Sequence, residues 1–274
     1  MSTFYMRYRE RRSTIRSLLC VGLDPDPERL PEGYPHEPRG LQEHLQHIVE
    51  ATADLALAYK PNAAFFESMG GEGWQILKKT IDFIRSASPD SLVVLDAKRG
   101  DLGNTASHYA RAVFDELDAD AVTLNPYMGR ESLEPFLERK DRAAFVLCLT
   151  SNSGARDFQY HGEPPLYQRV AGLCNQWHEE SGNLGLVVGA TRDPGELAKV
   201  RSLAPEMIFL VPGIGSQGGD LKAVLESAGP DLLINSSRSI LYASHQRSGI
   251  QDAARKEAMN LVEVMQDYSF SRSE

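Results

Sequence analysis

The stretch Leu92-Val93-Val94-Leu95-Asp96-Ala97-Lys98-Arg99-Gly100-Asp101 joins an apolar run to a cluster of charges. Four consecutive apolar residues are typical of a parallel strand that is covered on both faces. Because side chains alternate along a strand, Asp96 and Lys98 are predicted to lie on one face, with Asp101 beyond the turn at Gly100. A lysine between two carboxylates keeps its proton, which makes it a poor nucleophile but a well-placed acid. The alternative is a surface ion pair at a strand end, which is the commoner origin of such charges.

Similar apolar runs recur along the chain, and segments with helical periodicity separate them. The predicted strands are Leu19–Leu23, Leu57–Lys60, Leu92–Asp96, Ala121–Asn125, Ala143–Leu149, Leu184–Val188, Met207–Val211 and Leu232–Asn235. The predicted helices are Leu41–Ala56, Trp74–Ser86, Thr105–Leu117, Arg130–Glu138, Leu166–Glu180, Pro194–Leu203, Asp220–Ser227 and Ile250–Tyr268. Eight strand–helix units predict an α/β fold of the TIM (β/α)8 barrel type. A doubly wound sheet is the alternative, but no GxGxxG follows the first strand.

The 274 residues are predicted to form one barrel domain, 1–274, with an N-terminal helical extension. The start of the chain, Met1 to Arg16, is rich in arginine and is expected to be a helix packed on the barrel. The apolar run that follows it, Leu18–Leu23, is too short for the core of a signal peptide. Apolar stretches are also too short to span a bilayer.

Charge and cysteine content exclude several classes of function. A formal net charge of -9 argues against general binding to nucleic acid or to anionic membranes. The three cysteines contain no CxxC pair. Cys20 and Cys148 lie in apolar strand-like runs and are expected to be buried and reduced, which is consistent with a cytoplasmic location. The seven histidines form no ligand cluster, and His44 and His47 are expected to be a solvated pair on a helix. No metal ion or organic cofactor is predicted.

Polar residues stand at the ends of the predicted strands. In a barrel these ends meet at one mouth, so Asp24, Lys60, Asp96 and Lys98 are predicted to converge. Charged groups that converge are costly unless they are paired, which makes this mouth a candidate active site.

A second constellation follows the last two strands. Residues 211–220 form a glycine-rich loop that enters a helix, and its backbone N–H groups can donate to phosphate oxygens. After the last strand, Ser237 and Arg238 offer a hydroxyl and a guanidinium for the same group. A phosphate site at this position is a recurring feature of TIM barrels.

Residues 96–106, Asp-Ala-Lys-Arg-Gly-Asp-Leu-Gly-Asn-Thr-Ala, closely resemble the signature of the orotidine 5'-phosphate decarboxylase family, in the bacterial branch that has Arg-Gly between the lysine and the second acid. The resemblance spans most of the chain, because further matches follow in order at Asp24, Lys60-Pro61-Asn62, Gly189-Ala190-Thr191, residues 212–219 and Arg238-Ser239-Ile240. It implies a cofactor-free carboxy-lyase on a TIM barrel. Such an enzyme converts orotidine 5'-monophosphate to uridine 5'-monophosphate and carbon dioxide in de novo pyrimidine biosynthesis.

The resemblance also implies roles for particular residues. Lys98 would protonate C6 of the pyrimidine as carbon dioxide leaves, while Asp96 would lie against the substrate carboxylate. Lys60 would hold Asp96 and a ribose hydroxyl, and Asp24 would bind ribose. Asp101 and Thr105 would reach into the site of a neighbouring subunit, so the active site would belong to a homodimer. The other substrate-binding residues implied are Ser153, Pro212, Gly213, Gly215, Gln217, Ser237 and Arg238.

One position differs from the family pattern, and another can be matched to it in two ways. Ser237 stands where the family commonly has glycine. This difference affects a direct contact between the backbone and phosphate, although the serine N–H can still donate. Either Ser151 or Ser153 could contact the orotate ring, and Ser153 is favoured because it takes the serine's place in the usual Thr-Glu-Met-Ser pattern.

Two alternative functions use the same scaffold. Magnesium-dependent sugar-phosphate enzymes, such as hexulose-phosphate synthase or ketogulonate-phosphate decarboxylase, share an Asp-x-Lys-x-x-Asp strand. The other alternative is a catalytically silent nucleotide-binding barrel, against which the intact Lys98 and its two acids argue.

Overall fold

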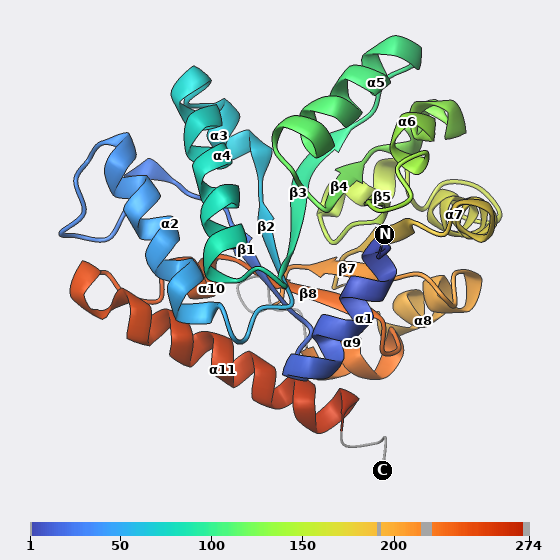
Figure 1. The fold of residues 1–274 in the computed structure, drawn as a ribbon. Coiled ribbons are helices and arrows are strands. Elements are labelled where there is room, and N and C mark those ends of the chain that lie inside the picture. Colours follow the sequence, from blue (N-terminus) through green and yellow to red (C-terminus); the bar gives the residue numbers. More distant parts are fainter. Residues whose placement is uncertain (1, 191–192, 215–220, 271–274) are drawn as a thin grey trace.

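Eight parallel strands pair in chain order, and the last pairs with the first to close a barrel (Figure 1). The computed structural model describes residues 2–190, 193–214 and 221–270. Its strands are β1 (Leu19–Leu23), β2 (Ala58–Pro61), β3 (Leu92–Arg99), β4 (Ala121–Leu124), β5 (Ala143–Leu149), β6 (Leu184–Val188), β7 (Phe209–Pro212) and β8 (Leu232–Ser236). The predicted TIM barrel is therefore confirmed.

The strands have two concentric cores because neighbouring side chains point to opposite faces. On β3, Leu92 and Val94 belong to the cluster inside the barrel. Val93 and Leu95 belong to the larger cluster between the strands and the surrounding helices. This double burial explains why the strands read as continuous apolar runs in the sequence.

Helices surround the barrel and cover its outer face, and one of them, α1, closes an end of it (Figure 1). They are α1 (Phe4–Ile15), α2 (Pro38–Thr52), α3 (Ala63–Glu67), α4 (Gly70–Ala87), α5 (Gly103–Arg111), α6 (Glu134–Leu137), α7 (Leu166–Ser181), α8 (Pro194–Leu203), α9 (Leu221–Ser227), α10 (Arg238–Leu241) and α11 (Ile250–Ser269). Short 3₁₀ turns are η1 (Pro27–Arg29), η3 (Pro126–Met128), η4 (Arg130–Ser132), η5 (Ser153–Asp157) and η6 (Arg247–Gly249).

Several helices differ from the prediction. The segment Arg130–Glu138 is not one helix but η4 followed by α6, with Pro135 in the first turn of α6, where its missing N–H costs no hydrogen bond. The segment Thr105–Leu117 begins as α5 and continues as a wider π-helical turn, η2 (Ala112–Glu116). Helix α3 was not predicted, since five residues are too few to show a helical period.

Helix α1 closes the end of the barrel at which the strands begin. Its Phe4 and Tyr8 belong to the core inside the barrel, and the Phe4 ring lies edge-on to Phe145 with the centroids 5.9 Å apart. The Tyr8 hydroxyl donates to the Leu232 carbonyl at 2.9 Å, at the start of β8. The expected N-terminal helix is therefore present and packs on the barrel, and the other end is left for the polar residues.

Candidate functional site

A line of alternating charges crosses the mouth of the barrel at the ends of β2 and β3. Asp96 Oδ2 accepts a hydrogen bond from Lys60 Nζ at 2.9 Å, and Asp96 Oδ1 accepts one from Lys98 Nζ at 2.6 Å. Asp24, directly after β1, places Oδ1 3.8 Å from Lys60 Nζ. The structure thus brings together four of the predicted site residues.

Burial differs sharply along this line. The Lys60 side chain is 3% exposed and that of Asp96 is 12% exposed, whereas the Lys98 side chain is 50% exposed. Lys60 is therefore an interior counter-ion, and Lys98 is the cation that a ligand in the mouth can reach.

The two buried members stabilise each other's charged form. Burial alone would lower the pKa of Lys60, but the nearby carboxylates of Asp24 and Asp96 outweigh it and hold the pKa above its ordinary value. Burial alone would raise the pKa of Asp96, but Lys60 and Lys98 outweigh it and hold that pKa well below the usual range. Asp96 is therefore a fixed carboxylate at neutral pH.

Lys98 reaches Asp96 by a distortion of β3 and not by simple alternation. The pairing of β3 with β4 shifts between Leu95 and Arg99, and Lys98 has a φ of 48°, in the left-handed region. Such a conformation is uncommon for a residue with a side chain. Arg99 follows at once, paired with Glu67 and lying over the Tyr109 ring at 5.1 Å from its centroid. The predicted proximity of Asp96 and Lys98 is confirmed, but a β-bulge produces it.

Thr123 on β4 completes the surroundings of Asp96 and was missed by the sequence reasoning. Its hydroxyl donates to Asp96 Oδ1 at 2.9 Å, and the residue is 1% exposed. One signal could have found it. Thr123 is the single hydroxyl-bearing residue in the apolar run Ala121–Leu124, and a buried hydroxyl needs polar partners.

The predicted phosphate site is described in part. The ends of β7 and β8 lie side by side, with Pro212 opposite Asn235 in the register, and Gly213 follows with a φ of 95° that favours glycine. Ser237 Oγ accepts from Asn235 Nδ2 at 3.2 Å, and Arg238 begins α10. Gly215 and Gln217 lie outside the described residues.

Other predicted site residues follow the ends of β3 and β5. Asp101 follows β3 and its carboxylate accepts from the Leu102 N–H at 2.8 Å, while Thr105 is exposed on α5. Ser153 begins the turn η5 after β5 and is exposed, as is Ser151. The choice between these two serines stays a prediction.

The predictions for the histidines and cysteines have different outcomes, and Cys20 lies in β1 near Lys60, Asp24 and Asp96. The prediction of a solvated pair at His44 and His47 was wrong for His44, which is completely buried and packs against the rings of Tyr34 and Tyr242. Cys20 and Cys148 are buried and free, as predicted, and Cys174 is buried and free as well. Within the three described ranges, no group of three or more acids, histidines or cysteines is arranged to hold a metal ion. In the same ranges, no helix combines the length and the apolar character needed to cross a membrane.

Comparisons with known proteins show the family to which the chain belongs. The sequence pattern of the orotidine 5'-phosphate decarboxylase / HUMPS family matches residues 17–253. A relative from Herpetosiphon aurantiacus, named orotidine 5'-phosphate decarboxylase, is 51% identical over 259 residues, which cover 93% of this chain and 95% of the relative.

Solved structures give the same result. An OMP decarboxylase of Leishmania donovani matches with a TM-score of 0.84 and 41% identity, covering 98% of this chain and all 100% of that one. The UMP synthase of the same organism matches with a TM-score of 0.87 and 43% identity, covering 99% of this chain. The chain spans 57% of the length of that synthase.

Proposed function

Since the chain belongs to the orotidine 5'-phosphate decarboxylase / HUMPS family, we propose that the charged line at its barrel mouth is where orotidine 5'-phosphate loses carbon dioxide. The reaction converts orotidine 5'-phosphate to uridine 5'-phosphate and is the decarboxylation for which the relatives are named. The observation that carries the assignment to this site is the contact of Lys98 Nζ with Asp96 Oδ1 at 2.6 Å, at the half-exposed end of an otherwise buried ion-pair line. The sugar-phosphate alternatives receive no support from the relatives' names.

The geometry suits a reaction without an electron sink. Loss of carbon dioxide from C6 leaves a carbanion whose electron pair is not conjugated with the ring. An ammonium fixed beside that carbon stabilises the developing charge and then supplies the proton. We assign this role to Lys98, because its side chain is the exposed cation of the line. Asp96 lies where it can face the substrate carboxylate, with Lys60 behind it as counter-ion.

The phosphate group is assigned to the ends of β7 and β8. Backbone N–H groups near Gly213 and the Arg238 guanidinium would hold it, together with Ser237 and the predicted residues Gly215 and Gln217. Binding energy gathered at a distant phosphate can be used to stabilise the transition state, so substrates that lack the phosphate should react far more slowly.

We propose a homodimer in which Asp101 and Thr105 serve the neighbouring site. Support comes from the loops that follow β3 and β4, where Leu102, Tyr127 and Met128 expose 41%, 83% and 42% of their surface. Large apolar side chains that stay exposed together are typical of interaction surfaces. A cytoplasmic location and a single domain over 1–274 remain part of the proposal.

The direct test is the decrease in orotate-ring absorbance when the purified protein meets orotidine 5'-phosphate in excess chelator. Turnover is expected under these conditions, and complete loss on chelation would favour the magnesium-dependent relatives. Lys98→Ala should lower kcat by about 10²- to 10⁴-fold while uridine 5'-phosphate still binds. Near-normal turnover by this variant would contradict the role of Lys98.

The shared site has its own test. Inactive Lys98→Ala and Asp101→Ala proteins are mixed and allowed to exchange subunits. A heterodimer then carries both lesions in one site and leaves the other intact, so activity should reappear. Absence of recovery after verified exchange would contradict the assignment of Asp101 to the neighbouring site.

A further inference from the structure

The Thr123 hydroxyl lies at the centre of three hydrogen bonds that all lead to the reacting end of β3. It accepts from the backbone N–H of Ala97 at 3.0 Å and from that of Lys98 at 2.9 Å. It also contacts Asp96 Oδ1 at 2.9 Å. The side chain is buried in the middle of β4, so water does not compete for these bonds.

The hydrogen-bond inventory of a hydroxyl fixes the direction of each bond. A threonine hydroxyl has one proton to donate and two lone pairs to accept with. Both lone pairs are occupied by the backbone N–H groups of Ala97 and Lys98, so the proton is directed at Asp96. All three hydrogen-bonding positions of the hydroxyl are therefore occupied. Its bond to Asp96 favours the ionised form of that carboxylate.

The same hydroxyl fills a gap in the strand ladder. Leu95 pairs with Val122 and Arg99 pairs with Leu124, so the three residues 96–98 of β3 lie opposite the single residue Thr123 of β4. A bulge of this kind leaves backbone N–H groups without ladder partners, and a buried N–H without a partner is costly. Thr123 supplies the acceptor for two of them and thereby stabilises the left-handed conformation of Lys98.

The buried threonine Thr80 behaves differently. It donates to the Ile76 carbonyl one turn earlier in its own helix, α4. That bond links a side chain to its own helix, whereas the bonds of Thr123 join β4 to both charged residues of β3.

We propose that Thr123 is a positioning residue for the decarboxylation. Its hydroxyl holds the β3 bulge in the shape that presents the Lys98 ammonium and, through the bond to Asp96, fixes the carboxylate that the ammonium contacts. The inference rests on the proposed function of the Lys98–Asp96 pair and adds to it a residue that does not touch the substrate.

The test compares substitutions that keep or remove the hydroxyl. Thr123→Val preserves the shape of the side chain and removes all three hydrogen bonds, whereas Thr123→Ser preserves them. Thr80→Val is the matched control, because it also removes a buried threonine hydroxyl. For each protein, kcat, KM and the Kd of uridine 5'-phosphate are measured, together with the melting temperature.

Thr123→Val should lower kcat by about 10- to 100-fold, since misplacement of a reacting group by about 1 Å costs about that much. KM and the Kd of uridine 5'-phosphate should stay within about threefold, because the phosphate is held elsewhere. Thr123→Ser should recover kcat to within about threefold, and Thr80→Val should match the unaltered protein in kcat. If Thr123→Val does not fold, Thr123→Cys takes its place. A thiol has about the same volume but forms only weak hydrogen bonds, so kcat should again fall while KM and the Kd of uridine 5'-phosphate stay within about threefold.

Three results would overturn the proposal. They are an unchanged kcat in the variant without the hydroxyl, a parallel loss of uridine 5'-phosphate binding, and a failure of Thr123→Ser to recover turnover. Absence of turnover in the unaltered protein is a separate result, because it would contradict the proposed function itself.

Discussion

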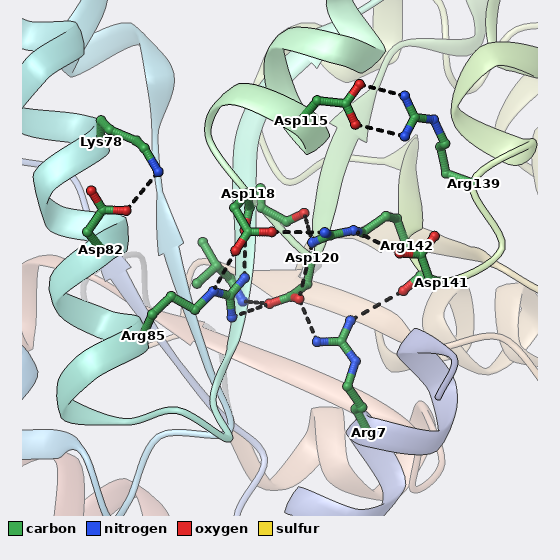
Figure 2. Close-up of polar contacts among 12 residues, drawn as sticks. Arg7, Lys78, Asp82, Arg85, Asp115, Asp118, Asp120, Arg139, Asp141 and Arg142 are labelled. Carbon is green, nitrogen blue, oxygen red and sulfur yellow. Dashed lines mark hydrogen bonds and ion pairs between the residues drawn. The ribbon is translucent and has the colours of Figure 1, made fainter. Parts of the chain in front are cut away.

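Asp120 is predicted to be a stability residue, and its carboxylate lies among the side chains of three arginines (Figure 2). It lies just before β4, is 1% exposed and accepts from the Val93 N–H at 2.7 Å. Its carboxylate also contacts Arg7 of α1 at 2.6 Å and Arg85 of α4 at 2.9 Å, and Arg142 lies 3.7 Å away. The perturbation is Asp120→Asn, which keeps the shape and removes the charge.

The expected loss of unfolding free energy depends on which hydrogen-bond acceptors the three arginines keep after the substitution. Breaking a buried ion pair by removing one partner costs about 3–5 kcal/mol. The three arginine side chains are 33%, 24% and 20% exposed and keep other acceptors, such as Asp118 for Arg85 and Arg142. The lower end, about 3 kcal/mol, is therefore expected, which corresponds to a fall in Tm of about 6–12 °C for a chain of this size class.

The assay is urea and thermal unfolding of Asp120→Asn beside Asp115→Asn. Asp115 makes a two-pronged pair with Arg139, but the side chains are 43% and 37% exposed, so its loss should cost at most about 1 kcal/mol (Figure 2). Turnover at 25 °C should stay normal in both variants, because neither residue is at the mouth. A loss of less than about 1 kcal/mol for Asp120→Asn, or an equal loss for both, would refute the reasoning.

Two further predictions concern the β1 side of the barrel. Burial lowers the pKa of His44 to about 4, so between pH 6.5 and 4 the unfolded chain binds a proton that the folded chain does not. The free energy of unfolding should therefore fall by about 3 kcal/mol as the pH drops through this window. His44→Phe should remove that part of the fall, and equal pH slopes in urea titrations of the two proteins would contradict the prediction. In Gly22→Ala, the new Cβ would lie 1.9 Å from Ser237 Oγ, so we expect a loss of about 1–3 kcal/mol of stability and a raised KM for orotidine 5'-phosphate. Gly71→Ala, where nothing lies within 4 Å, is the control, and equal effects of the two substitutions on KM would refute the argument.

The sequence predicts the barrel well because its strands are buried on both faces. Their continuous apolar runs, such as Leu92–Leu95, mark both their position and their parallel pairing. The site follows in outline, because strand ends share one mouth in this architecture. Asp24, Lys60, Asp96 and Lys98 are indeed joined there by ion pairs.

Features that depend on contacts between distant segments could not be read from the sequence. The bulge at Lys98 depends on Thr123, which is 25 positions further along the chain, and alternation within β3 does not predict it. His44 carries a polar ring on a helix, and its burial depends on Tyr34 and on Tyr242 from the far end of the chain. Local patterns predict secondary structure, whereas these side chains are placed by tertiary packing.

The position of α1 across the base of the barrel has a consequence for the order of folding. Arg7 forms an ion pair with Asp120. The Tyr8 hydroxyl donates a hydrogen bond to a carbonyl of β8 that is 224 positions away in the chain. A nascent chain emerging from the ribosome therefore exposes α1 long before its docking surface exists. Contacts between such distant positions form slowly, because the intervening loop must first close. Closure of the base by α1 is thus a late event in folding, although α1 precedes all eight strands in the chain.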